Sequence, residues 1–289
     1  MNMRPDVAFE NKFLAKEPPL TMAEDKAMEK YVDGVLKVEA PKMEDFEGLY
    51  SKEEIEKDKR EIERIKKDPK FREQHGRALI AAGIFYEEGE RSCWLGYETN
   101  VILTSEFDDI KRGSDFVLEI SQEDDSFERI AIDLTISEDQ GVLEDKYRSL
   151  RTRLSDGKLT DLKYYYSEIS KTKGAIENIP RAIVQIKKDQ LEELCKNIAD
   201  KSIDKATHPL QFGFLEEIVQ NFQDQLLFVK RLNEELIRNN KPQHSLAPQK
   251  LEKALNIIQD ILKQKEDEIK KRGLKQASRF WKHSLPHFL

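Results

Sequence analysis

The chain has 289 residues, of which 38% are hydrophobic and 36% are charged, and its formal net charge is −7. No run approaches the roughly 18 uninterrupted apolar residues of a membrane span, and the N-terminus lacks the basic and then apolar order of a signal peptide. Its two cysteines, Cys93 and Cys195, are far apart, which argues against a disulfide framework and favours a reducing, cytoplasmic compartment.

The first 70 residues predict an N-terminal extension that is helical in places and otherwise disordered. Residues 22–38 have the pattern of a short helix. The sequence Ser51-Lys-Glu-Glu54 is a capping box, whose side chains satisfy free N–H groups at the start of a helix. That helix carries Ile55 and Ile62 and is expected to end near Pro69.

Residues 71–205 alternate between helical and strand-like patterns. Helices are expected at 71–88, 90–104, 141–154 and 189–199. Strands are expected at 107–110, 115–121, 129–137, 160–167 and 182–186, with a polar hairpin loop at 122–126. From residue 90 the order is helix, three strands, helix, strand, strand, helix, which predicts an α/β fold with a mixed sheet.

Residues 206–289 predict a helical hairpin with a basic tail. One helix is expected at 214–239 and a second from Pro248 onward, joined as an antiparallel pair. Between Lys263 and Lys282, eight basic residues stand against three acidic ones. This tail either contacts phosphate or is a solvated amphipathic helix. The terminal helices also suit a homodimer or a protein partner.

Two neighbouring strands each carry an aspartate on their less apolar face. A period of two places Asp133 on the face opposite Ile132 and Leu134, and Asp115 on the face opposite Phe116. Buried strands rarely carry ionisable groups unless these are paired or bind a metal. The pattern therefore predicts a site for a divalent cation, Mg²⁺ or Mn²⁺, held by carboxylates.

The chain resembles the PD-(D/E)XK superfamily, the restriction-endonuclease-like nucleases, in a divergent form. The resemblance rests on Glu98 in an expected helix, Asp115 opening one strand and Asp133 inside the next. It implies an αβββαβ core at residues 71–205, flanked by the N-terminal helices and the C-terminal hairpin. It also implies that Glu98, Asp115 and Asp133 bind the metal and activate water. Asp108, Asp109 and Glu119 leave the ligand assignment open.

One position departs from the pattern of that superfamily. Two residues after Asp133 the superfamily usually has a lysine that polarises the attacking water, and this chain has Thr135. Some members carry the lysine on a neighbouring element. Lys146 is the first candidate substitute and Lys163 the second.

The sequence therefore predicts a metal-dependent nuclease-like protein that hydrolyses phosphodiester bonds of DNA or RNA. Its phosphate-binding surface is expected to comprise Lys111, Arg112, Lys146, Arg148, Arg151 and Arg153. The alternative is a catalytically inactive protein of the same fold that binds nucleic acid or a protein partner. Neither interpretation involves a membrane.

Overall fold

A computed structural model describes residues 20–67, 76–136, 140–200 and 208–271. Within these ranges, no helix combines the length and the apolar character needed to cross a bilayer. Both cysteines are free thiols. Parts of three expected features lie outside the described residues. They are the start of the helix expected from residue 71, the end of the strand expected to reach residue 137 and the basic tail beyond Lys271.

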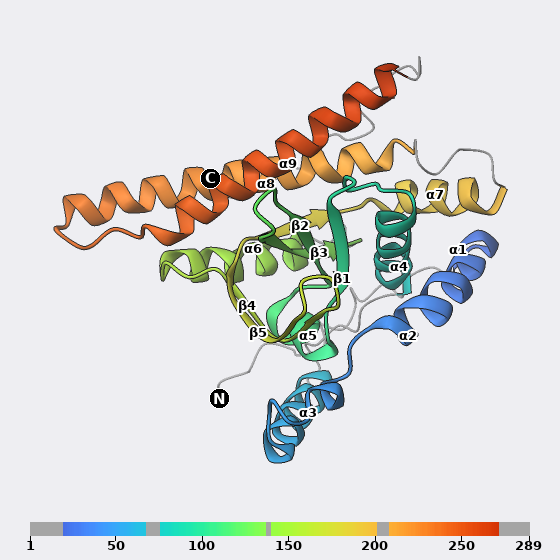
Figure 1. Cartoon of the computed structure of the whole chain (residues 1–289), viewed down its shortest axis with the longest axis horizontal. Helices are drawn as coiled ribbons and strands as arrows, with labels where there is room; N and C mark the ends of the chain where they lie inside the picture. The colour runs from blue at the N-terminus through green and yellow to red at the C-terminus, as the bar shows by residue number, and fades with distance from the viewer. Residues whose placement is uncertain (1–19, 68–75, 137–139, 201–207, 272–289) are drawn as a thin grey trace, which may run out of the picture.

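A four-stranded mixed sheet forms the centre of the structure (Figure 1). Its strands lie in the order β1 (Thr99–Leu103), β2 (Phe116–Ser121), β3 (Phe127–Thr135) and β6 (Arg181–Gln185). The β1–β2 and β2–β3 pairs are antiparallel, whereas β3 and β6 are parallel. A second, two-stranded antiparallel sheet consists of β4 (Thr160–Ser167) and β5 (Thr172–Ile179). The mixed α/β architecture expected from the sequence is confirmed.

Helices surround the sheet on several sides. The α-helices are α1 (Met22–Ala27), α2 (Lys37–Glu39), α3 (Lys52–Lys66), α4 (Gly76–Arg91), α5 (Glu106–Arg112), α6 (Gln140–Ser155), α7 (Lys188–Asp200), α8 (Leu210–Arg238) and α9 (Leu246–Lys271). A π-helical stretch, η2 (Met28–Leu36), joins α1 to α2, and a 3-10 turn, η3 (Met43–Phe46), precedes α3. The helices expected at 22–38, after Ser51, at 141–154 and at 189–199 are therefore confirmed.

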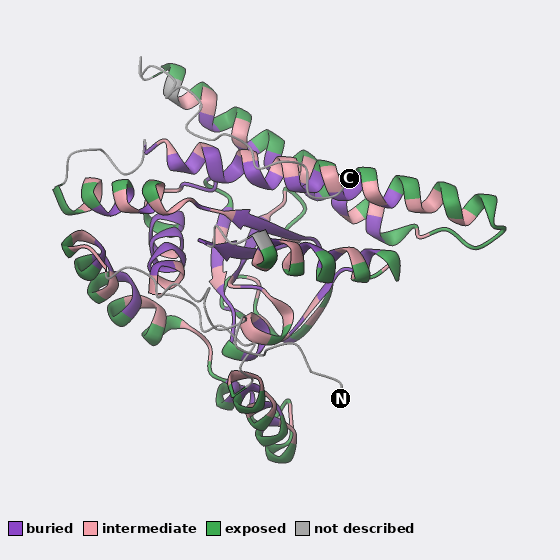
Figure 2. Ribbon diagram, turned by 180° about the vertical axis from the view of Figure 1, so that it is seen from behind, coloured by how far each residue is buried: buried purple, intermediate pink, exposed green. Residues whose placement is uncertain are grey.

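The two faces of the sheet are covered by different elements. Phe116 and Ile132 belong to the main hydrophobic core, which also contains residues of α4, α8 and α9. On the opposite face, Val117 packs with Leu162 and Ile179 of the β4–β5 hairpin. Because both faces are covered, β2 and β3 are buried along most of their length, and Figure 2 shows these strands buried beneath more exposed helices.

The long C-terminal helices form the expected hairpin. Helix α8 contacts both β6 and α9. Phe214 and Ile218 of α8 and Leu251 and Ile258 of α9 are fully buried in the main core. The helical spacing of these apolar residues explains why the hairpin was predictable.

The helix expected at 90–104 is wrong. Helix α4 ends at Arg91, and β1 begins at Thr99. Between them Cys93 and Gly96 have positive φ angles of 50° and 99°, which an α-helix does not accommodate. Of the apolar residues that suggested the helix, Trp94 and Tyr97 lie in the turn before β1, and Val101 and Ile102 lie on adjacent positions of β1, where Val101 is buried.

The strand expected at 107–110 is also wrong, because these residues form α5. The Ser105 hydroxyl accepts a hydrogen bond from the Asp108 N–H at 3.2 Å and caps the helix. Gly113, with φ of 66°, ends it in the left-handed conformation. Strand β5 was not expected from the sequence.

Candidate functional site

Asp115 lies directly across the sheet from Asp133. Phe116 of β2 pairs with Ile132 of β3, so the preceding residue of β2 faces the following residue of β3. The Asp115 N–H donates to the Ile132 carbonyl at 2.8 Å, and the Leu134 N–H donates to Asp115 Oδ2 at 2.7 Å. Both aspartates therefore lie on one face of the sheet. They are next to the first residue of β2, which follows α5 in the chain.

Lys146 reaches this pair of aspartates from α6. Its Nζ forms a hydrogen-bonded ion pair with Asp133 Oδ1. The Asp133 side chain is 3% exposed and that of Lys146 is 30% exposed. Burial alone would lower the pKa of Lys146, but the charges of Asp133 and Asp115 outweigh it and raise that pKa. Lys146 is therefore a cation at neutral pH.

Lys163, the second candidate substitute, is not brought to this site. Its Nζ lies 2.7 Å from Glu54 Oε1 and 2.6 Å from Asp58 Oδ2 of α3. The ion pairs fasten α3 to β4. Lys163 therefore helps to hold the N-terminal segment against β4.

Asp109 of α5 joins the cluster. Burial, followed by the negative charge of Asp115, raises the pKa of the Asp109 carboxyl well above its ordinary value, and Asp133 adds to the effect. The neighbouring Asp108 faces away, because its carboxylate accepts hydrogen bonds from the Lys163 and Tyr164 N–H groups, each at 2.8 Å. The two adjacent acids of α5 therefore have different roles, because Asp108 binds the backbone of β4 and Asp109 lies beside Asp115 and Asp133.

Arg181 lies behind the carboxylates and was not singled out from the sequence. Its Nη1 is 4.0 Å from Asp133 Oδ2, and it donates to the carbonyls of Arg112 (2.5 Å) and Gly113 (3.3 Å). Burial lowers the pKa of Arg181, and the charge of Asp133 opposes that effect. A Cβ atom on Gly113 would lie 2.7 Å from Arg181 Nη1 and 3.2 Å from Asp133 Oδ2, so this close approach requires glycine.

Glu98 is not brought to this cluster. It lies in the exposed turn before β1 rather than on a helix. Its carbonyl accepts a hydrogen bond from the Ser121 N–H at 2.9 Å, which places Glu98 at the end of β2 opposite to Asp115. The helix on which the assignment of Glu98 depended is absent, and we leave this residue out of the candidate site.

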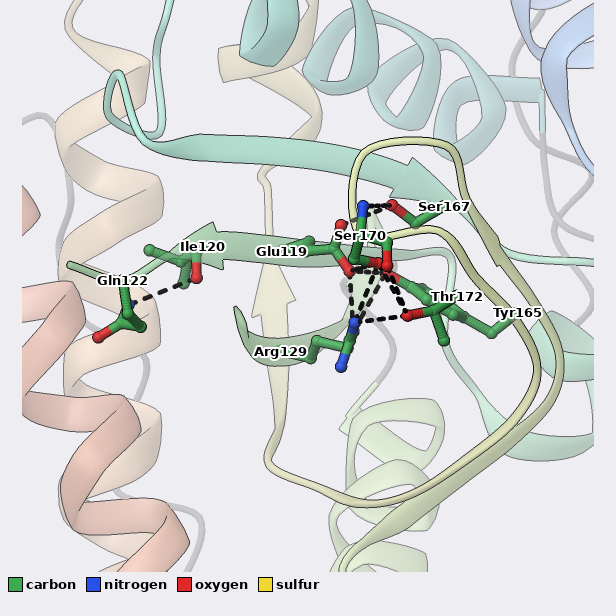
Figure 3. Close-up of polar contacts among 8 residues, drawn as sticks. All are labelled: Glu119, Ile120, Gln122, Arg129, Tyr165, Ser167, Ser170 and Thr172. Carbon is green, nitrogen blue, oxygen red and sulfur yellow. Dashed lines mark hydrogen bonds and ion pairs between the residues drawn. The ribbon is translucent and has the colours of Figure 1, made fainter. Parts of the chain in front are cut away.

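Glu119, which shares a strand face with Asp115, belongs to a separate buried network (Figure 3). Its carboxylate accepts hydrogen bonds from Ser167 at 2.5 Å, Tyr165 at 2.5 Å, Ser170 at 2.9 Å and Arg129 at 2.8 Å. Burial alone would raise the pKa of Glu119, but the hydrogen bonds, first that of Ser167, outweigh it and lower that pKa. This network fastens the β4–β5 hairpin to the sheet.

The donor chemistry of the cluster fits a hard divalent cation. Asp109, Asp115 and Asp133 offer oxygen ligands only, which suit Mg²⁺. Within the described residues, no three or more His, Cys, Asp or Glu side chains are arranged around a common metal position. Mg²⁺ commonly takes one or two protein carboxylates and completes its shell with water and substrate phosphate. Asp115 and Asp133 are sufficient for that mode.

Comparison of the chain with profiles of protein families, with curated proteins and with solved structures found no match. The functional interpretation of the site therefore depends on its geometry and chemistry.

Proposed function

We propose that this protein is a divalent-metal-dependent nuclease that hydrolyses phosphodiester bonds of DNA or RNA. One observation carries the proposal. Asp115 and Asp133 face each other on adjacent strands, and Lys146 from the following helix contacts Asp133. Two carboxylates can hold the divalent cation of metal-assisted phosphodiester hydrolysis. A lysine beside them matches the side-chain set that the resemblance to the PD-(D/E)XK superfamily implies.

The order of elements supports the proposal. Helix α4 is followed by β1, β2 and β3, then by α6 and β6, and β6 pairs in parallel with β3. This order resembles the αβββαβ core of the PD-(D/E)XK superfamily, with α5 and the β4–β5 hairpin as additions. Fold resemblance by itself does not specify an activity, so the proposal depends on the side chains.

Each residue of the cluster has a role that its environment permits. Asp115 and Asp133 would hold Mg²⁺, which when bound supplies positive charge to the phosphate that is cleaved. Lys146 remains protonated, so it donates a hydrogen bond to the attacking water or to a phosphate oxygen and does not act as the base. Thr135, which is 5% exposed, occupies the usual lysine position without replacing its charge.

The test is cleavage of labelled DNA and RNA in the presence of Mg²⁺ or Mn²⁺. Asp133→Asn should abolish cleavage, and the control Asp124→Asn, in the exposed loop between β2 and β3, should leave it unchanged. Circular dichroism would show that both variants fold. The proposal of a nuclease would be refuted if wild type and Asp133→Asn cleaved equally well, or if wild type did not cleave at all.

A second candidate is a catalytically inactive protein of this fold. Lys146 neutralises one carboxylate, and no three-ligand metal arrangement exists among the described residues. Titration calorimetry distinguishes the two candidates, because the nuclease requires Mg²⁺ binding that Asp133→Asn weakens. Nucleic-acid binding without either metal binding or cleavage would favour the inactive form.

A further inference from the structure

Two cations lie against the Asp133 carboxylate, at different oxygen atoms. The Nζ of Lys146 forms its ion pair with Oδ1, whereas the Nη1 of Arg181 lies 4.0 Å from Oδ2. The Lys146 side chain is 30% exposed, but that of Arg181 is only 4% exposed. Solvent therefore reaches the first cation, while the protein encloses the second.

The main chain of Arg181 is held from two directions. Arg181 begins β6 and pairs with Ala131 of β3, whose N–H donates to the Pro180 carbonyl at 2.8 Å. From the other side, the buried side chain of Gln225 in α8 donates to the Arg181 carbonyl at 2.8 Å. The sheet and α8 thus fix the point from which the guanidinium extends.

The guanidinium of Arg181 connects Asp133 to the turn that precedes β2. Its Nη1 donates to the carbonyls of Arg112 and Gly113, at 2.5 and 3.3 Å. Asp115, the other proposed metal ligand, follows two residues after Gly113. Among the residues that the structure describes, Asp133 is the only acid that forms a salt bridge with Arg181. One enclosed guanidinium therefore joins the strand of one carboxylate to the turn that leads to the other.

The two oxygen atoms of Asp133 differ in how accessible they are to a metal ion. Oδ2 faces Arg181, and a Cβ atom on Gly113 would lie 3.2 Å from it, so the protein already fills that side. Oδ1 faces Lys146, whose partly exposed ammonium stands on a flexible four-carbon stem. A cation that arrives from solvent would therefore meet Oδ1 and displace Lys146 from it.

We propose that Arg181 is a positioning residue that holds Asp133 through Oδ2 and thereby presents Oδ1 to the divalent cation, an inference that rests on the proposed function. Side chains that orient a metal ligand from behind typically contribute about 10- to 100-fold to metal affinity or activity. Lys146, in contrast, competes with the metal for Oδ1. The two cations beside Asp133 therefore have opposite effects on metal binding.

Titration calorimetry of the full chain with MgCl₂, without nucleic acid, measures these effects. Arg181→Lys keeps the charge but loses the planar fork that spans the carbonyls and the carboxylate, so it should raise the Kd for Mg²⁺ about tenfold. Arg181→Met should also raise the Kd, although removal of a repelling charge alone would lower it. Lys146→Met should lower the Kd about threefold or more, because it removes the competitor.

Arg129→Lys is the matched control. Arg129 also pairs with a buried carboxylate of the same sheet, that of Glu119, at 2.8 Å, but in a separate network. Its Kd for Mg²⁺ should stay within about twofold of wild type, because the two networks share no partner. Urea unfolding of each variant would show that the measured protein is folded.

Three results would count against these roles. A wild-type Kd in Arg181→Lys, or a lowered Kd in Arg181→Met, would overturn positioning by Arg181. A Kd of Lys146→Met that is not below that of wild type would overturn the assignment of Oδ1, and this variant tests the assignment even if the Arg181 variants do not fold. Each of these results leaves the nuclease intact as long as wild type binds Mg²⁺ and cleaves. Absence of Mg²⁺ binding by wild type would instead overturn the proposed function, and the role of Arg181 with it.

Discussion

Removing the ammonium of Lys146 tests whether the centre of the candidate site is formed as described. Lys146→Met keeps an unbranched side chain as far as Cε and deletes the charged ammonium group. The Asp133 carboxylate, 3% exposed, would then retain Arg181 at 4.0 Å as its cationic neighbour. Removing one partner of a fully buried ion pair costs about 3–5 kcal/mol of stability. Because Lys146 is 30% exposed and Arg181 remains, we expect a loss of about 2 kcal/mol.

Urea unfolding followed by circular dichroism at pH 7 measures this loss. Lys146→Met combined with Asp133→Asn should be more stable than Lys146→Met alone, because the buried carboxylate that has lost its ammonium partner is removed as well. Lys253→Met is the matched control, since its salt bridge to Glu128 is 2.5 Å long but Lys253 is 52% exposed. Its effect should stay below about 1 kcal/mol.

The same variants separate stability from activity. Lys146→Met should lower the cleavage rate by about 10²- to 10⁴-fold, and the double variant should stay inactive although its stability recovers. A coupling energy between Lys146 and Asp133 below about 0.5 kcal/mol would refute the ion pair. Full cleavage by Lys146→Met would refute the role given to this lysine.

Two further predictions concern charge at the site and burial away from it. Asp109→Asn removes one of three clustered acids, so it should stabilise the protein by up to about 1 kcal/mol in urea unfolding. A destabilised variant would contradict the electrostatic argument. His208 is buried against Trp94, and burial lowers its pKa from 6.5 to about 4. The unfolded chain therefore takes up a proton first, and the free energy of unfolding should fall by up to about 3 kcal/mol as the pH drops from 6.5 to 4. His208→Gln should flatten this dependence in urea titrations between these pH values, and an unchanged pH slope would contradict it.

Regular periodicity made part of the fold predictable. The alternation in β2 and β3 identified both strands and placed Asp115 and Asp133 on the same face. Ser51 identified the start of α3, and the apolar stripes of α8 and α9 identified the hairpin. These signals are local, because each depends on residues within one or two turns or one strand.

Elements with short or ambiguous patterns were assigned incorrectly. The apolar residues of 90–104 fit both a helix and a strand, and pairing of β1 with β2 after the turn at Gly96 decided between them. The segment 107–110 is too short for its periodicity to distinguish helix from strand. As a result, the ligand assignment stayed open between Asp108, Asp109 and Glu119, and Glu98 was placed on a helix that the structure does not form.

The sequence by itself determined the two facing aspartates, the missing lysine at Thr135 and the long helices, because each is encoded in consecutive residues. Only the tertiary structure decided which distant charges meet them. Packing of α6 on the sheet brings Lys146 to Asp133, and parallel pairing of β6 with β3 brings Arg181 beneath the same carboxylate. Salt bridges with nearby acids neutralise the expected phosphate contacts Lys111, Lys146, Arg148, Arg151 and Arg153, because charge compensation depends on distances in space that sequence separation does not specify.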